Sequence, residues 1–313
     1  MRPQWIDARC SRLPGIPGAV SLRLGSTEWK ERLDSEVSAR LAELDRFGVQ
    51  TQVLYAPPTL GVDDSLATPD GLGIVNDVLE VVASSASGRL RCIAHIEFDD
   101  STRGMRALET AMSHGFCGVA VGTRHGDHRL DQPFFRPFLT CAERHGIPVL
   151  VRSIGLQGSG PLIDERQQNN VGVHGDLAIC IARMIFAGVF EELPRLGIYL
   201  LEGGGILPGL VARLDHGYEV RKECRALLPK PPSSYLRNVY VDGASMDEAT
   251  LKCTISLLGR SQILFASDVA DCVAERRRID QVLAHTGDAR SQVTSVCDEN
   301  ARRLYGLGDS NAH

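Results

Sequence analysis

The chain has 313 residues, of which 43% are hydrophobic, and its formal net charge is −5. This length suits one α/β barrel with additions, and the hydrophobic content can supply a large core. The mild negative charge without a basic stripe argues against nucleic acid as a partner, and no apolar run is long enough to span a membrane.

Cysteine usage indicates the compartment. Nine cysteines are scattered along the chain without a C-x-x-C pair. This odd, dispersed set is typical of reduced thiols and not of a disulfide framework or a zinc finger. The first residues also lack the apolar core of a signal peptide. We therefore expect a cytoplasmic protein.

A strand followed by a helix is the repeating pattern of the chain. Repeated roughly seven or eight times, this alternation implies a parallel sheet with helices outside it. A closed barrel fits better than an open sheet, because no G-x-G-x-x-G motif opens a helix. We expect one domain over residues 1–313, with insertions at 12–33 and 227–234. The expected strands are 48–55, 90–96, 118–122, 147–151, 196–201, 239–242 and 262–266, and the expected helices are 76–84, 103–114, 134–145 and 177–192.

The apolar run 196–201 ends at Glu202, which three glycines follow. Consecutive glycines cost backbone entropy, so they are usually kept where another backbone or a ligand must come close. Barrel enzymes keep their chemistry at the carboxyl ends of strands, which makes Glu202 a candidate. A tight turn with a solvated glutamate is the alternative, and both stay open here. The long polar loop 152–173 is typical of a lid or a binding loop.

Several segments carry a resemblance to a known family. The longest is 177–217, and shorter ones are 6–7, 13–14, 44–54, 131–137, 238–242, 267–268 and 300–301. They resemble the amidohydrolase-related family that contains aminocarboxymuconate-semialdehyde decarboxylase and the aromatic-acid decarboxylases. The likeness covers almost the whole chain. It implies a distorted (β/α)8 TIM barrel of the metal-dependent hydrolase type, usually dimeric.

The chain departs from this family at the metal site. Where the family has a His-x-His after its first strand, this sequence has Arg9 and Ser11, and Arg152 stands in place of a third histidine. Glu202 occupies the position of a catalytic histidine. The aspartate of the family's Ser-Asp motif is kept as Asp268.

Arginine stays protonated and has no lone pair to give, so Arg9 and Arg152 cannot replace imidazole ligands. Zinc needs about three or four donors in close geometry. The family implies zinc, yet we expect neither a metal nor another cofactor at these positions.

Two interpretations of the altered site remain. In the first, the arginines pair with Asp268 and Glu202 as a salt-bridged plug, since unpaired buried charges are costly. The protein would then be an inactive ligand-binding or partner subunit. In the second, Arg9 and Arg152 bind a small substrate carboxylate and Glu202 acts as acid or base, giving decarboxylation, isomerisation or cyclisation. Hydrolysis is the weaker variant, because no triad is evident.

Other candidates complete the predicted site. His174, with Asp176, follows the long loop in an element that carries an acidic residue in the family, and His95 ends a predicted strand. A structural role is the alternative for each histidine. By resemblance, Arg213 reaches the substrate carboxylate of a neighbouring subunit, which implies a homodimer. His125 and His128 have a weakly metal-like spacing, but a solvated loop is the better explanation.

Overall fold

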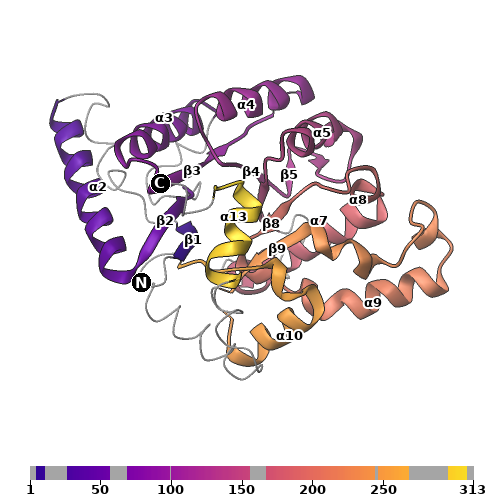
Figure 1. The fold of residues 1–313 in the computed structure, drawn as a ribbon. Helices are drawn as coiled ribbons and strands as arrows, with labels where there is room; N and C mark the ends of the chain where they lie inside the picture. Colours follow the sequence, from indigo (N-terminus) through magenta and orange to yellow (C-terminus); the bar gives the residue numbers. More distant parts are fainter. Residues whose placement is uncertain are drawn as a thin grey trace. The chain divides into compact units, whose positions relative to one another are not determined.

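The computed structural model describes residues 5–10, 27–56, 69–98, 100–155, 167–243, 246–267 and 295–308 (Figure 1). Helices and strands alternate along these residues, as the sequence predicts. In chain order they are β1 Trp5–Cys10, α2 Thr27–Phe47, β2 Val49–Leu54, α3 Pro69–Ser85, β3 Leu90–His95, α4 Ser101–Ser113, β4 Gly118–Gly122, β5 Arg124–His125, β6 His128–Arg129, α5 Arg136–His145, β7 Val149–Arg152, α7 Val173–Phe186, α8 Val189–Glu192, β8 Ile198–Leu200, α9 Leu207–Val220, β9 Val239–Asp242, α10 Glu248–Leu258, β10 Ile263–Leu264 and α13 Asn300–Tyr305.

Eight strands form one sheet in the order β1-β2-β3-β4-β7-β8-β9-β10. Strand β1 pairs in parallel with β2, and β2 with β3; the same parallel pairing joins β7, β8, β9 and β10. A parallel order that follows the sequence requires a crossover helix between neighbours, which explains the strand–helix alternation. The predicted parallel α/β architecture is therefore confirmed. Strands β5 and β6 form a separate antiparallel hairpin.

The strands owe their positions to short apolar runs that are buried on both faces. All three residues of β8 and the first three of β7 are buried, and β4 is buried from Gly118 to Val121. Local signals set helix ends. Asp247 caps α10 by accepting a hydrogen bond from the Thr250 amide at 2.7 Å, and α5 ends at Gly146 in a left-handed conformation, φ 65°.

Most expected segments differ in their bounds by a few residues, and the helix expected at 76–84 spans Pro69–Ser85. The helix expected at 177–192 begins at Val173, and Gly188, with φ 72°, separates α7 from the short α8. Of the insertion expected at 12–33, residues 27–33 form the first turns of α2, and residues 11–26 lie outside the described ranges.

The chain divides into two compact units, and each is described by itself. Unit 1 comprises residues 1–96, 110–119 and 265–313, and unit 2 comprises residues 97–109 and 120–264. One domain over 1–313 stays a prediction. Within the described residues, no helix is long and apolar enough to cross a bilayer. The cysteines whose side chains are described are all free, namely Cys92, Cys117, Cys141, Cys180, Cys224, Cys253 and Cys297.

Unit 1 contains a buried polar cluster around Asp7 on β1. The Asp7 carboxylate accepts hydrogen bonds from Gln52 Nε2 at 2.8 Å, from the Ser267 amide at 3.0 Å and from Ser267 Oγ at 2.6 Å. Gln52 is the register partner of Asp7 on β2, and both side chains are fully buried. Such a carboxylate is tolerated in a core only because donors surround it.

We predict that Asp7→Ala lowers the free energy of unfolding by about 3 kcal/mol, because it leaves the donors of Gln52 and Ser267 buried without an acceptor. Urea denaturation measures the change. Asp77→Ala removes an exposed carboxylate from α3 of the same unit and should stay within about 0.5 kcal/mol of the unmodified chain. Equal stability of both variants would contradict the prediction.

Candidate functional site

Arg152 is the last residue of β7, in unit 2, whereas the sequence predicts it just after the strand expected at 147–151. Its backbone oxygen accepts a hydrogen bond from the Thr123 amide at 3.0 Å, which links the carboxyl ends of β7 and β4. Its guanidinium Nε is buried, and no described residue accepts a hydrogen bond from it. A buried, charged donor without an acceptor is costly, so this position is suited to receiving an anionic ligand.

Glu202 follows β8 by two residues and is half-buried. Its backbone φ is 54°, in the left-handed region that residues other than glycine rarely adopt. Such a conformation costs about 1–3 kcal/mol and is often found at functional sites. Among the residues with described side chains, neither Glu202 nor Arg152 forms an ion pair. These two groups therefore do not neutralise each other.

The three glycines after Glu202 all have positive φ: 62° at Gly203, 78° at Gly204 and 63° at Gly205. Gly205 lies against the backbone of His174, where an added Cβ would approach the His174 Cα to 2.8 Å. The Ile206 amide also donates a hydrogen bond to the His174 oxygen at 3.4 Å. The expectation that another backbone comes close to this loop is thus confirmed. That backbone is the first turn of α7.

His174 itself is half-buried at the second position of α7. Two residues later, Asp176 Oδ2 accepts hydrogen bonds from Thr123 Oγ1 and Ser153 Oγ, each at 2.7 Å, and from the Ile154 amide at 3.2 Å. A carboxylate in the first turn of a helix also interacts favourably with the helix dipole. Asp176 therefore fixes the segment that follows Arg152 to the start of α7.

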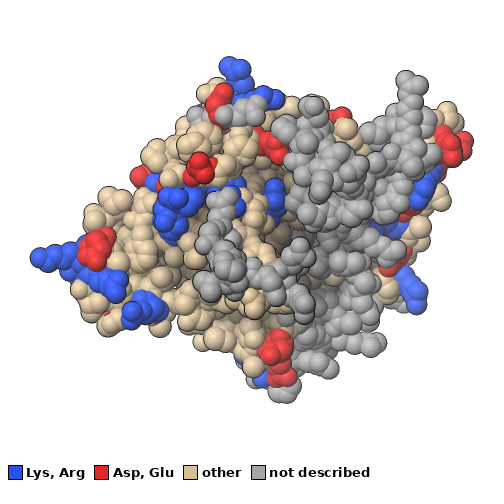
Figure 2. Space-filling view, turned by 180° about the vertical axis from the view of Figure 1, so that it is seen from behind, with Lys and Arg blue, Asp and Glu red and all other residues tan. Residues whose placement is uncertain are grey.

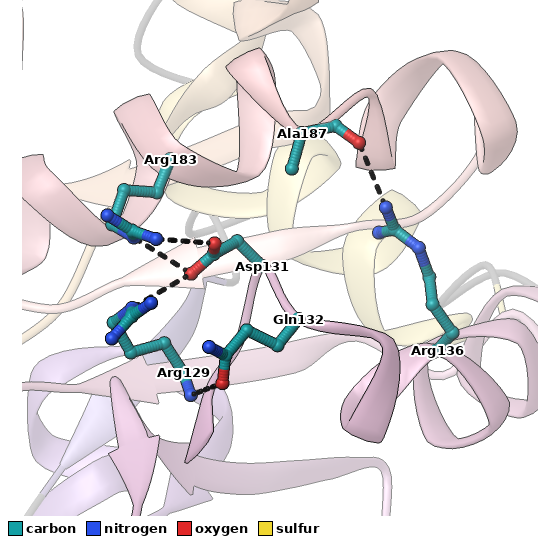
Figure 3. Close-up of polar contacts among 6 residues, drawn as sticks. All are labelled: Arg129, Asp131, Gln132, Arg136, Arg183 and Ala187. Atoms are coloured by element: carbon teal, nitrogen blue, oxygen red, sulfur yellow. Dashed lines mark hydrogen bonds and ion pairs between the residues drawn. The ribbon is translucent and has the colours of Figure 1, made fainter. Parts of the chain in front are cut away.

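A second carboxylate stabilises unit 2 farther along α7. Asp131 accepts two hydrogen bonds from Arg183, both at 2.9 Å, and lies 3.6 Å from Arg129 (Figure 3). In the same view, Arg136 donates to the Ala187 oxygen at 3.0 Å. These contacts tie the hairpin segment and α5 to α7. The residues 131–137 that carry part of the family resemblance therefore have a structural role here.

The sequence analysis missed Glu97, which follows β3 by two residues. Arg152, His125 and Arg103 each lower the pKa of its carboxyl, but burial outweighs them and raises that pKa above the usual value. Its position just beyond a strand, at the edge where the other candidates lie, is the signal that could have identified it. None of the sequence segments that carry the family resemblance includes Glu97.

The histidine pair of the hairpin takes part in aromatic packing. His125 on β5 and His128 on β6 face each other across the antiparallel pair. His128 stacks on Phe134 with the ring centroids 4.2 Å apart, and His125 lies beside Phe98 at 6.1 Å. Aromatic packing therefore explains their spacing.

One other cluster has metal-ligand chemistry, formed by Glu109, Cys141 and His145. The guanidinium of Arg144 lies among them, 3.2 Å from His145 Nε2 and 3.6 Å from both the Cys141 sulfur and the Glu109 carboxylate. A fixed cation already occupies this position, so a metal ion would be repelled.

The remaining candidates are described one by one, because no described contact joins them to this group. His95 is buried at the end of β3 in unit 1; its amide donates to Asn76 Oδ1 at 2.9 Å, and its ring lies 5.3 Å from that of Tyr55. Arg213 is exposed on α9. The side chain of Arg9, together with Ser11 and Asp268, lies outside the described ranges. Among the described residues on the face shown in Figure 2, acidic and basic side chains are interspersed.

Comparisons with known proteins agree with the resemblance. A family model described as Amidohydrolase matches residues 6–307. The chain is 26% identical over 266 residues to the 2-amino-3-carboxymuconate-6-semialdehyde decarboxylase of Dictyostelium discoideum, covering 83% of this chain and 72% of that one.

Solved structures show the same fold. A 2,6-dihydroxybenzoate decarboxylase complexed with 2,6-dihydroxybenzoate has a TM-score of 0.74 and 22% identity, covering 98% of this chain and 99% of the other. A dihydroxybenzoic acid decarboxylase from Polaromonas sp. JS666, solved with bound manganese and 2-nitroresorcinol, has a TM-score of 0.72 and 20% identity, covering 98% and 97%. The predicted fold, an α/β barrel of the amidohydrolase type, is confirmed.

We predict that Gly205→Ala destabilises the protein by about 2 kcal/mol or more, because it combines a left-handed φ with a collision against the His174 backbone. Gly209 provides the matched control: it lies four residues later, within α9, and nothing lies within 4 Å of an added Cβ. Gly209→Ala should stabilise by about 0.5–1 kcal/mol. Thermal unfolding measures both, and an unchanged midpoint in Gly205→Ala would show that the contact is unimportant.

Proposed function

Because the chain belongs to the amidohydrolase family, we propose that it is a carboxy-lyase-like enzyme that acts on a small conjugated or aromatic carboxylate without a metal. The relatives named above are decarboxylases, and one was solved with manganese. The observation that carries the proposal is the buried Nε of Arg152 at the end of β7. No described residue accepts a hydrogen bond from this nitrogen. A substrate carboxylate is the acceptor that this donor lacks.

The residues at the family's metal positions do not fit a divalent cation. Arg152 is described at the end of β7, and the sequence places Arg9 and Ser11 at the other two histidine positions. Guanidinium groups have no lone pair to donate and would repel the ion. The remaining carboxylates are too few to make a site beside two fixed cations. The mechanism proposed here therefore contains no metal step.

Arg152 is proposed to bind and orient the substrate carboxylate through charge-assisted hydrogen bonds, with Arg9 assisting. Guanidinium groups can also stabilise negative charge that develops during the reaction, which is part of what a metal ion does in related sites. Ser11 and His95 are proposed to contact the remainder of the substrate. The partner is thus a small anionic molecule.

Glu202 is proposed to act as the general acid, and its strained backbone supports this role. A residue other than glycine with φ 54° carries conformational strain, which is often found at functional sites, and this supports a role for its carboxyl group. In decarboxylation the bond between the substrate carbon and the carboxylate breaks, and the electron pair stays on that carbon. A proton from Glu202 then forms the new C–H bond as carbon dioxide leaves. His174 and Asp268 complete the proposed catalytic set.

The same groups could carry out isomerisation or cyclisation, because each of these reactions also moves a proton at carbon.

The alternative to catalysis is a salt-bridged plug. Among the described residues, Arg152 and Glu202 do not pair with each other, which supports a ligand-binding site over a plug. An exposed Arg213 on α9 is compatible with a homodimer in which this side chain reaches the substrate of the partner subunit.

Glu202→Gly tests the proposal, because the two interpretations predict opposite results. We expect the free energy of unfolding to rise by about 0.5–1 kcal/mol, since glycine tolerates this φ, while kcat falls by about 10²–10⁴-fold. Arg152→Gln should lower kcat/KM by about 100-fold through lost carboxylate binding. The assay is carbon dioxide release from a panel of aromatic and muconate-type carboxylates.

Ser87→Gly is the matched control, because Ser87 is the other non-glycine residue with positive φ, 47°, among the described residues, and it is exposed. It should gain similar stability without a change in activity. Unchanged activity together with reduced stability in Glu202→Gly would favour the plug. An unmodified protein that releases no carbon dioxide across the panel would contradict the proposal.

Metal content provides an independent check. We expect protein purified without chelator to contain less than about 0.1 equivalent of zinc or manganese, because arginine cannot ligate either ion. Chelator treatment should leave activity unchanged. Stoichiometric metal that Asp268→Ala removes, measured by elemental analysis, would refute metal independence.

A further inference from the structure

Within the described residues, the side chain of Arg152 has no polar partner that fixes its guanidinium. None of these residues accepts a hydrogen bond from its buried Nε, and none forms an ion pair with it. A long side chain without such partners takes its direction from its backbone and from packing. The orientation in which Arg152 meets a ligand therefore depends on what fixes the carboxyl end of β7.

Two contacts place the end of β7 against the end of β4. The Thr123 amide donates a hydrogen bond to the Arg152 backbone oxygen at 3.0 Å. The Ile154 side chain packs against Gly122, where an added Cβ would lie only 2.9 Å from Ile154 Cγ2. The residues on both sides of the Arg152 carbonyl are thus in contact with the neighbouring strand end.

Asp176, in the first turn of α7, binds these same residues. Its Oδ2 atom accepts hydrogen bonds from Thr123 Oγ1 and Ser153 Oγ, each at 2.7 Å, and from the Ile154 amide at 3.2 Å. Hydrogen bonds to an ionised acceptor are roughly twice as strong as those between neutral groups. Three donors converge on one oxygen, and no described residue donates to the other oxygen, Oδ1. Loss of this one atom would release both strand ends from α7.

We propose that Asp176 is a positioning residue for the anion site: it binds the residues that flank Arg152 and thereby holds the guanidinium in the orientation that binds a substrate carboxylate. This inference rests on the proposed function, since it requires a carboxylate ligand at Arg152. Asp176 itself does not touch the substrate. Its effect reaches the ligand only through Arg152.

The physical reason is the geometry that a guanidinium–carboxylate pair requires. Two parallel hydrogen bonds form only when both groups lie in one plane at the right separation. A displacement of about 1 Å at such a site can cost roughly 100-fold in rate. A backbone that is free to shift at Ser153 would let the Arg152 guanidinium leave this geometry, although its charge remains.

The experiment compares Asp176→Ala with Asp176→Asn in the full chain, below the unfolding transition of each variant. The probe is 2,6-dihydroxybenzoate, and calorimetric titration gives its Kd. Asp176→Ala removes the acceptor of all three donors, so Kd should rise by about 10–100-fold. Asparagine can place its carbonyl oxygen at the position of Oδ2 and its amide nitrogen at that of Oδ1, so Asp176→Asn should raise Kd by less than about threefold.

A double-mutant cycle shows whether Asp176 acts through Arg152. In a chain that carries Arg152→Gln, Asp176→Ala should raise Kd no further, because the guanidinium that Asp176 positions is gone. A residue with a general structural role would weaken binding by the same factor in both chains. Ligand-observed NMR measures the weak dissociation constants of the chains that lack Arg152.

Thr123→Val is a milder variant that keeps the test decisive if Asp176→Ala does not fold. It removes one of the three donors to Asp176, and the backbone hydrogen bond to the Arg152 oxygen stays. We expect Kd to rise by about two- to fivefold, and only in the chain that retains Arg152.

Asp131→Ala is the matched control, because Asp131 also binds α7. Its carboxylate accepts two hydrogen bonds from Arg183, both at 2.9 Å, and lies 3.6 Å from Arg129. These partners are not in the segment 152–155. The variant should lose stability, as Asp176→Ala does, while its Kd stays equal to that of the unmodified protein.

The outcomes separate the two proposals. No binding of the probe by the unmodified protein, or unmodified affinity in Arg152→Gln, would refute the carboxylate site and the inference with it. If Arg152→Gln weakens binding, the role of Asp176 alone is refuted by an unchanged Kd in Asp176→Ala or Thr123→Val, or by an equal rise in Asp131→Ala. The same holds for a loss in Asp176→Asn as large as that in Asp176→Ala, or for equal effects of Asp176→Ala with and without Arg152.

Discussion

A single carboxylate oxygen of Asp176 determines the geometry of the candidate site. It accepts hydrogen bonds from Thr123 beyond β4, from Ser153 and Ile154 beyond β7, and it does so from the first turn of α7. Charge-assisted hydrogen bonds of this kind are among the stronger ones in proteins. Because Arg152 immediately precedes Ser153, the position of its guanidinium depends on this contact.

The same helix turn also shapes the loop after β8. The backbone of His174 lies so close to Gly205 that a side chain there would collide with it. Glu202 begins this loop in a left-handed conformation, and three glycines with positive φ follow. Helix α7 therefore positions the two charged groups on which the proposed chemistry depends, Arg152 from one strand end and Glu202 from the next.

Two departures from ordinary protein architecture occur at these two residues. Several other charged groups of unit 2 are paired: Asp131 binds Arg183 in a bidentate pair, and Arg136 lies 2.9 Å from Glu192, although Arg136 Nη1 is also a buried donor without an acceptor among the described residues. At the strand ends, Arg152 keeps a buried donor without an acceptor among the described residues, and Glu202 keeps a strained backbone. Local rules are usually broken where function requires it. The proposal of altered chemistry depends on the interpretation, taken from the resemblance, that both residues replace histidines of the family.

The sequence by itself determined the strand–helix alternation, the parallel sheet and the place of Glu202 after β8, because short apolar runs and glycines act through local burial and backbone freedom. It also indicated that another backbone or a ligand would come close to the glycine loop. Only the tertiary structure decided that this backbone belongs to His174, that Asp176 joins two strand ends to α7, and that Arg152 and His125 act on the pKa of the Glu97 carboxyl. These relations connect residues up to about fifty-five positions apart, for instance Glu97 with Arg152. Hydrophobic periodicity does not encode such pairings, since it fixes which face of an element is buried but not which distant side chains meet there.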